Sequence, residues 1–167
     1  EAAVTTLKKF PEREFLLSGE LVTNNKTALK EEELKFFTKK HKQIKYLGKT
    51  DDMATLLKKV DVMILPSYRE GLSKSLIEAA AMKIPIITTN VPGCKTVVKH
   101  NHNGVLCEAK SVKSLSRAIE KMIKISEKER CKMGENGRVL VEKYFKEERV
   151  IKDYSNQISK TQTPVKS

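Results

Sequence analysis

Short apolar runs alternate with longer amphipathic segments along the 167 residues. The runs are rich in Val, Ile and Leu and predict buried strands over 15–18, 44–47, 60–65, 84–88 and 104–107. The amphipathic segments repeat apolar residues every three or four positions and predict helices over 29–41, 52–59, 74–82, 112–125 and 137–154. Such alternation is typical of a parallel sheet covered by helices. The pattern therefore predicts an open α/β fold.

Polar residues and glycines separate the predicted segments. Asp51, Asp52 and Ser111 stand where helix N-caps are expected. Turns are expected at five glycines, Gly48, Gly71, Gly93, Gly104 and Gly134. The last residues carry Ser, Thr, Gln, Pro and Lys with little to bury. We therefore expect one domain over 1–158 and a flexible tail over 159–167.

The chain is strongly basic, with 33 Lys and Arg against 21 Asp and Glu and a net charge of +12. Such a surface attracts polyanions. The basic residues are scattered, however, and Trp is absent, so no nucleic-acid partner is expected. Charged residues interrupt every apolar run, so no membrane span is predicted. The charge suits phosphate-bearing ligands and an anionic membrane surface.

The cysteines and histidines predict no metal site and no disulfide. Cys94, Cys107 and Cys131 form no close pair, which favours a reducing cytoplasm. His100, His102 and Cys107 lack the spacing of metal ligands. We expect neither a metal nor another cofactor.

Three glycine motifs resemble known sites but lack required residues. Gly48-Lys49-Thr50 lacks the earlier glycine of a P-loop, because position 43 is Gln. Gly19 is not followed by the further glycines of a dinucleotide-binding fingerprint. The segment 71–75 ends in Ser where a nucleophile elbow needs Gly. Because these required residues are missing, we do not expect a Walker-type NTPase, a standard NAD site or a serine hydrolase.

The segment 65–82 departs from this pattern. It runs from a buried strand through a loop into an alanine-rich helix that should begin near Ser73 or Lys74. Unpaired N–H groups and the positive dipole end in its first turn favour a diphosphate. Glu70 in the loop and Glu78 in the helix could each accept hydrogen bonds from neighbouring sugar hydroxyls.

A purely structural interpretation of the two glutamates stays open on spacing alone. Glu70 would interact with the helix dipole, and Glu78 would form a surface pair with Lys74 or Lys83.

Several motifs follow one another in a family-like order: Pro66-Ser67-x-x-Glu70-Gly71-Leu72, Leu76-Ile77-Glu78-Ala79, Pro85-Ile86-Ile87-Thr88-Thr89, Val91-Pro92-Gly93 and Asn103-Gly104. Together they resemble the donor-binding half of glycosyltransferase family 4 (group 1), the retaining enzymes of GT-B fold. The resemblance covers about 15–154 and implies a Rossmann-like three-layer parallel sheet, the C-terminal half of a GT-B enzyme.

The resemblance also implies roles for individual residues. Glu70 would hold the donor sugar as the catalytic glutamate, and Glu78 would bind the ribose of a nucleotide, with UDP or GDP as the carrier. The remaining donor-binding positions that it implies are Gly71 and Leu72 beside the sugar, Ser73, Lys74 and Ser75 at the diphosphate, Gly48 and Lys49 at the base, and Gly19 beside the nucleotide.

The chain departs from the family's pattern at its start. The sequence has neither an initiator Met nor a signal sequence at Glu1, and the family's Gly-Arg-x-x-x-x-Lys-Gly segment does not stand before it. We therefore expect a fragment that lacks the acceptor domain. Such a fragment is expected not to transfer sugar alone. Ser73-Lys74-Ser75 is nearer the forms common in capsule, lipopolysaccharide and lipid-linked oligosaccharide synthesis. The expected acceptor is a glycan or lipid-linked molecule, at the inner face of the membrane. A noncatalytic module that binds nucleotide or polyanion stays open as the alternative.

Overall fold

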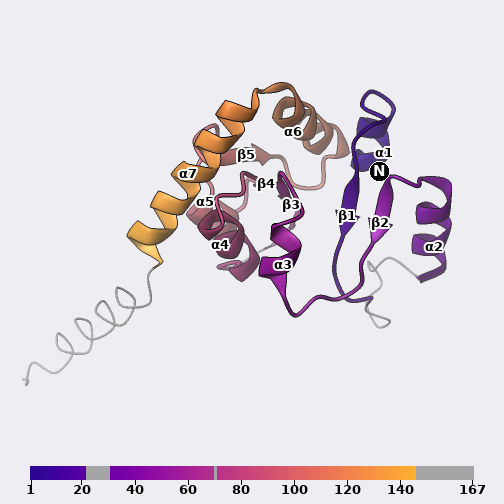
Figure 1. Cartoon of the computed structure of the whole chain (residues 1–167), viewed down its shortest axis with the longest axis horizontal. Coiled ribbons are helices and arrows are strands. Elements are labelled where there is room, and N and C mark those ends of the chain that lie inside the picture. Colours follow the sequence, from indigo (N-terminus) through magenta and orange to yellow (C-terminus); the bar gives the residue numbers. More distant parts are fainter. Residues whose placement is uncertain (22–30, 70, 146–167) are drawn as a thin grey trace, which may run out of the picture.

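Strands and helices alternate through the computed structural model, which describes residues 1–21, 31–69 and 71–145 (Figure 1). The elements are α1 (Ala2–Leu7), β1 (Phe15–Leu17), α2 (Glu31–Lys40), β2 (Ile44–Tyr46), α3 (Met53–Leu57), β3 (Met63–Leu65), α4 (Lys74–Ala81), β4 (Ile86–Thr89), α5 (Pro92–Val97), β5 (Gly104–Cys107), α6 (Val112–Lys124) and α7 (Glu127–Tyr144). This order confirms the predicted α/β class.

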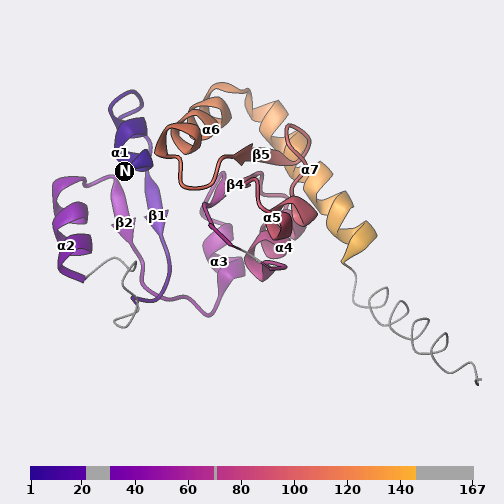
Figure 2. The ribbon, with the colours of Figure 1, turned by 180° about the vertical axis from the view of Figure 1, so that it is seen from behind.

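All strands pair in parallel, and they form two hydrogen-bonded sheets. β1 pairs with β2, with Phe15 opposite Ile44. The second sheet has the order β3-β4-β5, with Met63 opposite Ile86 and Ile86 opposite Gly104. β1 and β3 are the neighbouring members of the two sheets (Figures 1 and 2). In the described residues no backbone ladder joins them, so the one open sheet that we expected is divided.

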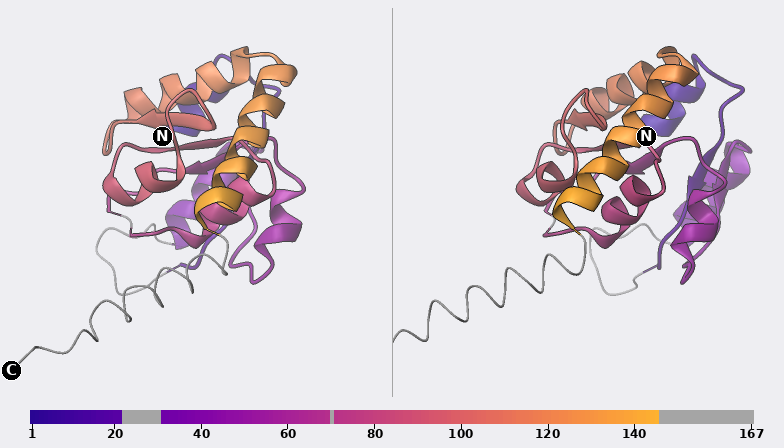
Figure 3. Two further views of the ribbon diagram at one scale, coloured as in Figure 1. Left: turned by 90° about the vertical axis from the view of Figure 1, so that its left-hand side faces the viewer. Right: turned by 60° about the vertical axis from the view of Figure 1, so that its left-hand side comes forward.

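Helices cover both faces of the three-stranded sheet, which confirms its three layers. Successive residues of β4 point to opposite faces. Ile86 packs in a core with residues of α4, α5 and α7, whereas Ile87 packs in a second core with residues of α1 and α6. Both side chains are fully buried. The right-hand view of Figure 3 shows β1, β2 and α2 as a group beside these layers.

The start of α7 lies ten residues before the predicted position 137. Its N-terminus is a capping box, in which Ser126 and Glu129 exchange hydrogen bonds. Gly134, expected in a turn, lies inside this helix where it meets the backbone of Lys83. The prediction was wrong because this glycine permits a close approach between elements.

Other boundary predictions have mixed outcomes. Asp52 and Ser111 are N-caps, and their side chains accept from the N–H groups of Thr55 and Ser114. Asp51 precedes a cap and is not one itself. Gly93 lies in α5 and not in a turn. Residues 146–158 of the predicted domain and the predicted tail 159–167 lie outside the described residues.

Candidate functional site: the carboxyl ends of the parallel strands

α4 begins at Lys74 with Ser73 as its N-cap residue, as predicted. Ser73 is buried, and its hydroxyl lies 3.1 Å from the hydroxyl of Ser75 instead of capping the helix. The N–H groups of a first helical turn have no partner within the helix. The backbone N–H groups in the first turn of α4 are therefore not capped by the side chain of Ser73.

Two threonine hydroxyls hold the start of the loop that leads from β3 to α4. The hydroxyl of Thr88 donates to the carbonyl of Leu65 at 2.8 Å, and that of Thr89 donates to the carbonyl of Ser67. Both threonines are buried in β4. Sequence reasoning missed them, although two threonines closing an apolar strand were a visible signal. They position the backbone that enters the predicted donor loop.

Glu78 lies on the exposed side of α4, one turn after Lys74. The Nζ atom of Lys74 lies 3.7 Å from Oε1 of Glu78. The side chain of Lys74 is 90% exposed and that of Glu78 is 36% exposed. This is the surface pair of the structural interpretation, without Lys83, and such exposed pairs contribute little to stability. The ribose-binding role of Glu78 stays a prediction. Glu70, the predicted catalytic residue, lies outside the described residues.

The structure brings together the two glycine loops that follow β1 and β2. The N–H of Gly19 donates to the carbonyl of Gly48 at 3.0 Å, and the hydroxyl of Ser18 donates to the same carbonyl. The hydroxyl of Tyr46 donates to the carbonyl of Gly19 at 2.7 Å. Gly48 has φ 74°, a left-handed conformation that favours glycine. These bonds give the paired loops a defined shape.

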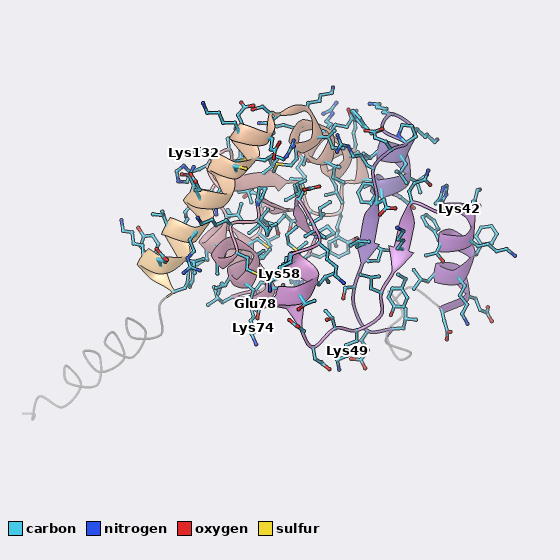
Figure 4. The ribbon with its side chains drawn as sticks, viewed as in Figure 1. Lys42, Lys49, Lys58, Lys74, Glu78 and Lys132 are labelled. Atoms are coloured by element: carbon cyan, nitrogen blue, oxygen red, sulfur yellow. The ribbon has the colours of Figure 1, made fainter. Side chains whose placement is uncertain are left out.

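Both groups of predicted residues lie at the carboxyl edge of their sheet. Lys49 follows β2 and pairs with Glu20 at 3.2 Å, whereas Lys74 and Glu78 belong to the helix after β3. Figure 4 shows Lys49, Lys74 and Glu78 at the same end of the molecule. Gly71 and Leu72 are exposed between β3 and α4. Ligands of open α/β sheets bind at this edge.

The absence of a metal or other cofactor stays a prediction. Across 1–21, 31–69 and 71–145, no three His, Cys, Asp or Glu residues gather closely enough to hold an ion. His100 accepts a hydrogen bond from the N–H of Leu106 instead. All three cysteines are free, and burial raises the pKa of the Cys107 thiol. In these same ranges no helix is long and apolar enough to cross a bilayer.

A family model described as "Glycosyl transferases group 1" matches residues 1–140. The chain belongs to this family. The match covers both glycine loops and the segment from β3 through α4, so the predicted recognition is confirmed at the level of the group.

Two relatives show how much of a longer protein the match represents. The N-acetyl-alpha-D-glucosaminyl L-malate synthase of Bacillus anthracis is 34% identical over 112 residues, which are 67% of this chain and 29% of that protein. The capsular polysaccharide biosynthesis glycosyltransferase CapM of Staphylococcus aureus is 32% identical over 130 residues, which are 78% and 33%. The chain thus spans about a third of these relatives.

Solved structures confirm the fold. The C-terminal domain of a group 1 glycosyl transferase, LpcC of Francisella tularensis, has a TM-score of 0.75 and 28% identity, covering 87% of this chain and 76% of that one. Anabaena HepE in complex with UDP has a TM-score of 0.83 and 18% identity, covering 95% and 44%. The chain therefore has the Rossmann-like C-terminal half of a GT-B glycosyltransferase.

Proposed function

We propose that this chain is the nucleotide-sugar-binding domain of a retaining glycosyltransferase of family 4. The observation that carries the proposal is the first turn of α4, which begins at the carboxyl edge without a side-chain cap from Ser73. A diphosphate accepts hydrogen bonds from such N–H groups and is favoured by the helix dipole. Lys74 adds a positive charge at the same turn.

The remaining roles are those that the family resemblance implies for residues before and after that turn in the sequence. Glu78, one helical turn further on, is assigned to the ribose hydroxyls, and Glu70 to the hydroxyls of the donor sugar. Gly71 and Leu72 would let the backbone approach the sugar, while Ser73 and Ser75 face the diphosphate. The paired loops that carry Gly19, Gly48 and Lys49 are assigned to the nucleoside. Their hydrogen bonds support this assignment by giving a fixed backbone surface.

The proposed reaction breaks the bond between the anomeric carbon and the diphosphate oxygen. The electron pair leaves with the diphosphate, and the sugar gains oxocarbenium character. The N-terminus of α4 stabilises the leaving group without a metal ion, and Glu70 helps to position the sugar. The acceptor hydroxyl attacks the face from which the diphosphate leaves, its proton passes to the departing diphosphate, and the configuration is retained.

Donor and acceptor are proposed at the level of chemical class. The donor is proposed to be UDP- or GDP-linked, and the UDP in the HepE structure supports the first of these. CapM is named for capsular polysaccharide biosynthesis, which supports a glycan or lipid-linked acceptor in surface polysaccharide synthesis. The B. anthracis relative is named for L-malate, so a small hydroxy acid is the competing acceptor class to assay. We place the protein in the cytoplasm, at the inner face of the membrane.

The isolated 167-residue chain should bind donor without transferring sugar, because it spans about a third of its relatives. Titration calorimetry with UDP-, GDP- and ADP-sugars tests the binding. Glu78→Gln and Glu70→Gln should each weaken binding about 10- to 100-fold, since hydrogen bonds to a charged group contribute roughly 1.5–3 kcal/mol. Glu135→Gln, which removes the same charge from the exposed side of α7, is the matched control. Unchanged binding in both site variants would refute the assignments.

The alternative function is a noncatalytic module that binds nucleotide or polyanion through the +12 surface. Such binding falls steeply with salt and is insensitive to the loss of one glutamate. Saturable binding of one nucleotide-sugar with a shallow salt dependence would exclude it. Sugar transfer by the isolated chain would show that the rest of the length seen in its relatives is not required.

A further inference from the structure

The loop between β3 and α4 is fixed at both of its ends. Two threonine hydroxyls of β4 hold its start, as far as the carbonyl of Ser67, and Ser73 is buried at its end. Between these points the described residues are all exposed: Tyr68, Arg69, Gly71 and Leu72. The positions assigned to the donor sugar belong to this exposed part. A contact that holds it from another element would therefore act on the donor site.

Tyr68 has such a contact with the loop between β5 and α6. The Nζ of Lys110 lies over the Tyr68 ring, 5.7 Å from the ring centroid. The face of an aromatic ring attracts a cation that lies within about 6 Å of its centroid. Because β4 lies between β3 and β5 in the sheet, this contact connects the loops of two strands that are not paired with each other.

The loop that carries Lys110 is itself held in place. The N–H of Glu108 donates to the hydroxyl of Ser114 at 3.0 Å, and the N–H of Ser114 donates to Ser111, the N-cap residue of α6. Lys110 has φ 60°, a left-handed conformation that lysine rarely adopts. Its side chain thus extends from an anchored backbone toward a ring on an exposed loop. The geometry makes Lys110 the holding residue and Tyr68 the held one.

We propose that Lys110 and Tyr68 are positioning residues for the donor sugar. Their contact holds the exposed part of the β3–α4 loop, the part whose sequence contains Glu70 and Gly71. This inference rests on the proposed function, in which the glycine loops bind the nucleoside and the β3–α4 loop binds the sugar. The contact should therefore strengthen binding of the sugar and leave binding of the nucleotide unchanged. A contact that only stabilised the fold would affect both alike.

Cleavage by an arginine-specific protease tests whether the contact holds the loop, because Arg69 directly follows Tyr68 and is exposed. Cleavage after Arg69 in the donor-free full chain should be about 2- to 5-fold faster in Lys110→Met, since loss of one exposed cation–π contact raises the open population by about this factor. This variant leaves the cleaved sequence intact. Lys110→Arg keeps the cation and should be cleaved at the original rate.

Variants of the ring complete the comparison. Tyr68→Leu should also be cleaved about 2- to 5-fold faster, whereas Tyr68→Phe keeps an aromatic ring and should not. The double variant Y68L/K110M should be cleaved about as fast as the single variants, because all three lack the same contact. Additive increases, or an unchanged rate in Lys110→Met, would overturn the proposal.

The chain offers a matched control on α7. There the Nζ of Lys143 lies 5.1 Å from the centroid of the Tyr144 ring. Lys143→Met and Tyr144→Leu remove a contact of the same kind outside the β3–α4 loop. Both should leave the rate of cleavage after Arg69 unchanged. An increase equal to that of Lys110→Met would show a general loosening of the chain and count against the positioning role.

Calorimetry separates the sugar from the nucleotide. The full chain is titrated with UDP-, GDP- and ADP-sugars and with the matching nucleoside diphosphates. Lys110→Met should weaken the nucleotide-sugar about 2- to 5-fold and the diphosphate less than about twofold, and Lys110→Arg should restore the affinity. Equal losses for both ligands would refute the positioning role. If the unmodified chain bound none of these ligands, the proposed function would fail as well. If it bound a nucleotide-sugar equally in all variants, only the positioning role would fail.

Discussion

Gly134 and Gly137 provide a test of packing within one helix. α7 packs against α4, and Gly134 lies where α7 meets Lys83, two residues after the end of α4. A Cβ atom at 134 would lie 1.9 Å from the carbonyl oxygen of Lys83 and 2.7 Å from its carbonyl carbon. A Cβ atom at 137 would lie 3.5 Å from Ala80, an ordinary contact. The same substitution should therefore have opposite effects at the two sites.

The magnitudes follow from two terms. Replacing glycine by alanine inside a helix contributes about 0.8–1.0 kcal/mol to stability. At Gly134 the clash requires the backbone to move about 1.5 Å to reach ordinary contact, and overpacking of this kind costs about 1–3 kcal/mol or more. Because the clash is with backbone, we take the upper end of that cost, about 3 kcal/mol, so that Gly134→Ala should destabilise the protein by about 2 kcal/mol. Gly137→Ala should stabilise it by up to about 1 kcal/mol.

Urea denaturation followed by circular dichroism measures both changes. Because 1 kcal/mol corresponds to about 2–4 °C in a domain of this size, thermal melting should separate the two variants by several degrees. The geometric reasoning is refuted if Gly134→Ala is as stable as the unmodified chain, or if both variants shift in the same direction. Unchanged m-values would show that the comparison concerns the folded state.

Two further predictions concern a buried hydroxyl and an acidic cap. Thr89→Val should destabilise the protein by about 1–3 kcal/mol in urea denaturation, because the carbonyl of Ser67 loses its hydrogen-bond donor, and it should also weaken binding of the nucleotide-sugar. Thr89→Ser keeps the hydroxyl and should lose less stability. Equal losses in the two variants would contradict this role. The side chain and N–H of Ser126 donate hydrogen bonds to the Glu129 carboxylate and lower the pKa of Glu129. The contribution of ionised Glu129 to folding stability is therefore fully present above the unfolded-state pKa of about 4.3 and is lost as the pH falls through the lower folded-state pKa. Urea titrations at falling pH should show a weaker acid dependence for Glu129→Gln, and an unchanged dependence would count against the cap.

Local chemistry made much of the fold predictable. The start of α4 could be placed because a Pro-containing loop ends in serines before an alanine-rich run, and Asp52 and Ser111 are caps whose bonds span three residues. α5 was missed because Pro92 and Gly93 look like a turn, although proline suits the first position of a helix. Gly134 was misplaced because its neighbour, Lys83, is distant in sequence.

The candidate site was predictable as two separate loops, and their internal bonds were not. Periodicity placed Gly19 and Gly48 after strands, but only the parallel pairing of β1 with β2 makes their hydrogen bond possible. The Thr89 contact depends in the same way on β4 lying beside β3. Sequence spacing could not decide between a surface ion pair of Glu78 with Lys74 and a contact of Glu78 with a ligand, since both require Glu78 at the same place on α4.

The division of the strands into two sheets bears on cooperativity. Side chains such as Phe15 and Ile64 share a core, yet no backbone ladder links β1 to β3 within the described residues. Amide protons of β1 and β2 can then exchange through an opening that leaves β3, β4 and β5 paired. The glycine loops belong to the first unit and the α4 turn to the second. A molecule that contacts both would act as a cross-link, and part of its binding free energy would be used to align the two units.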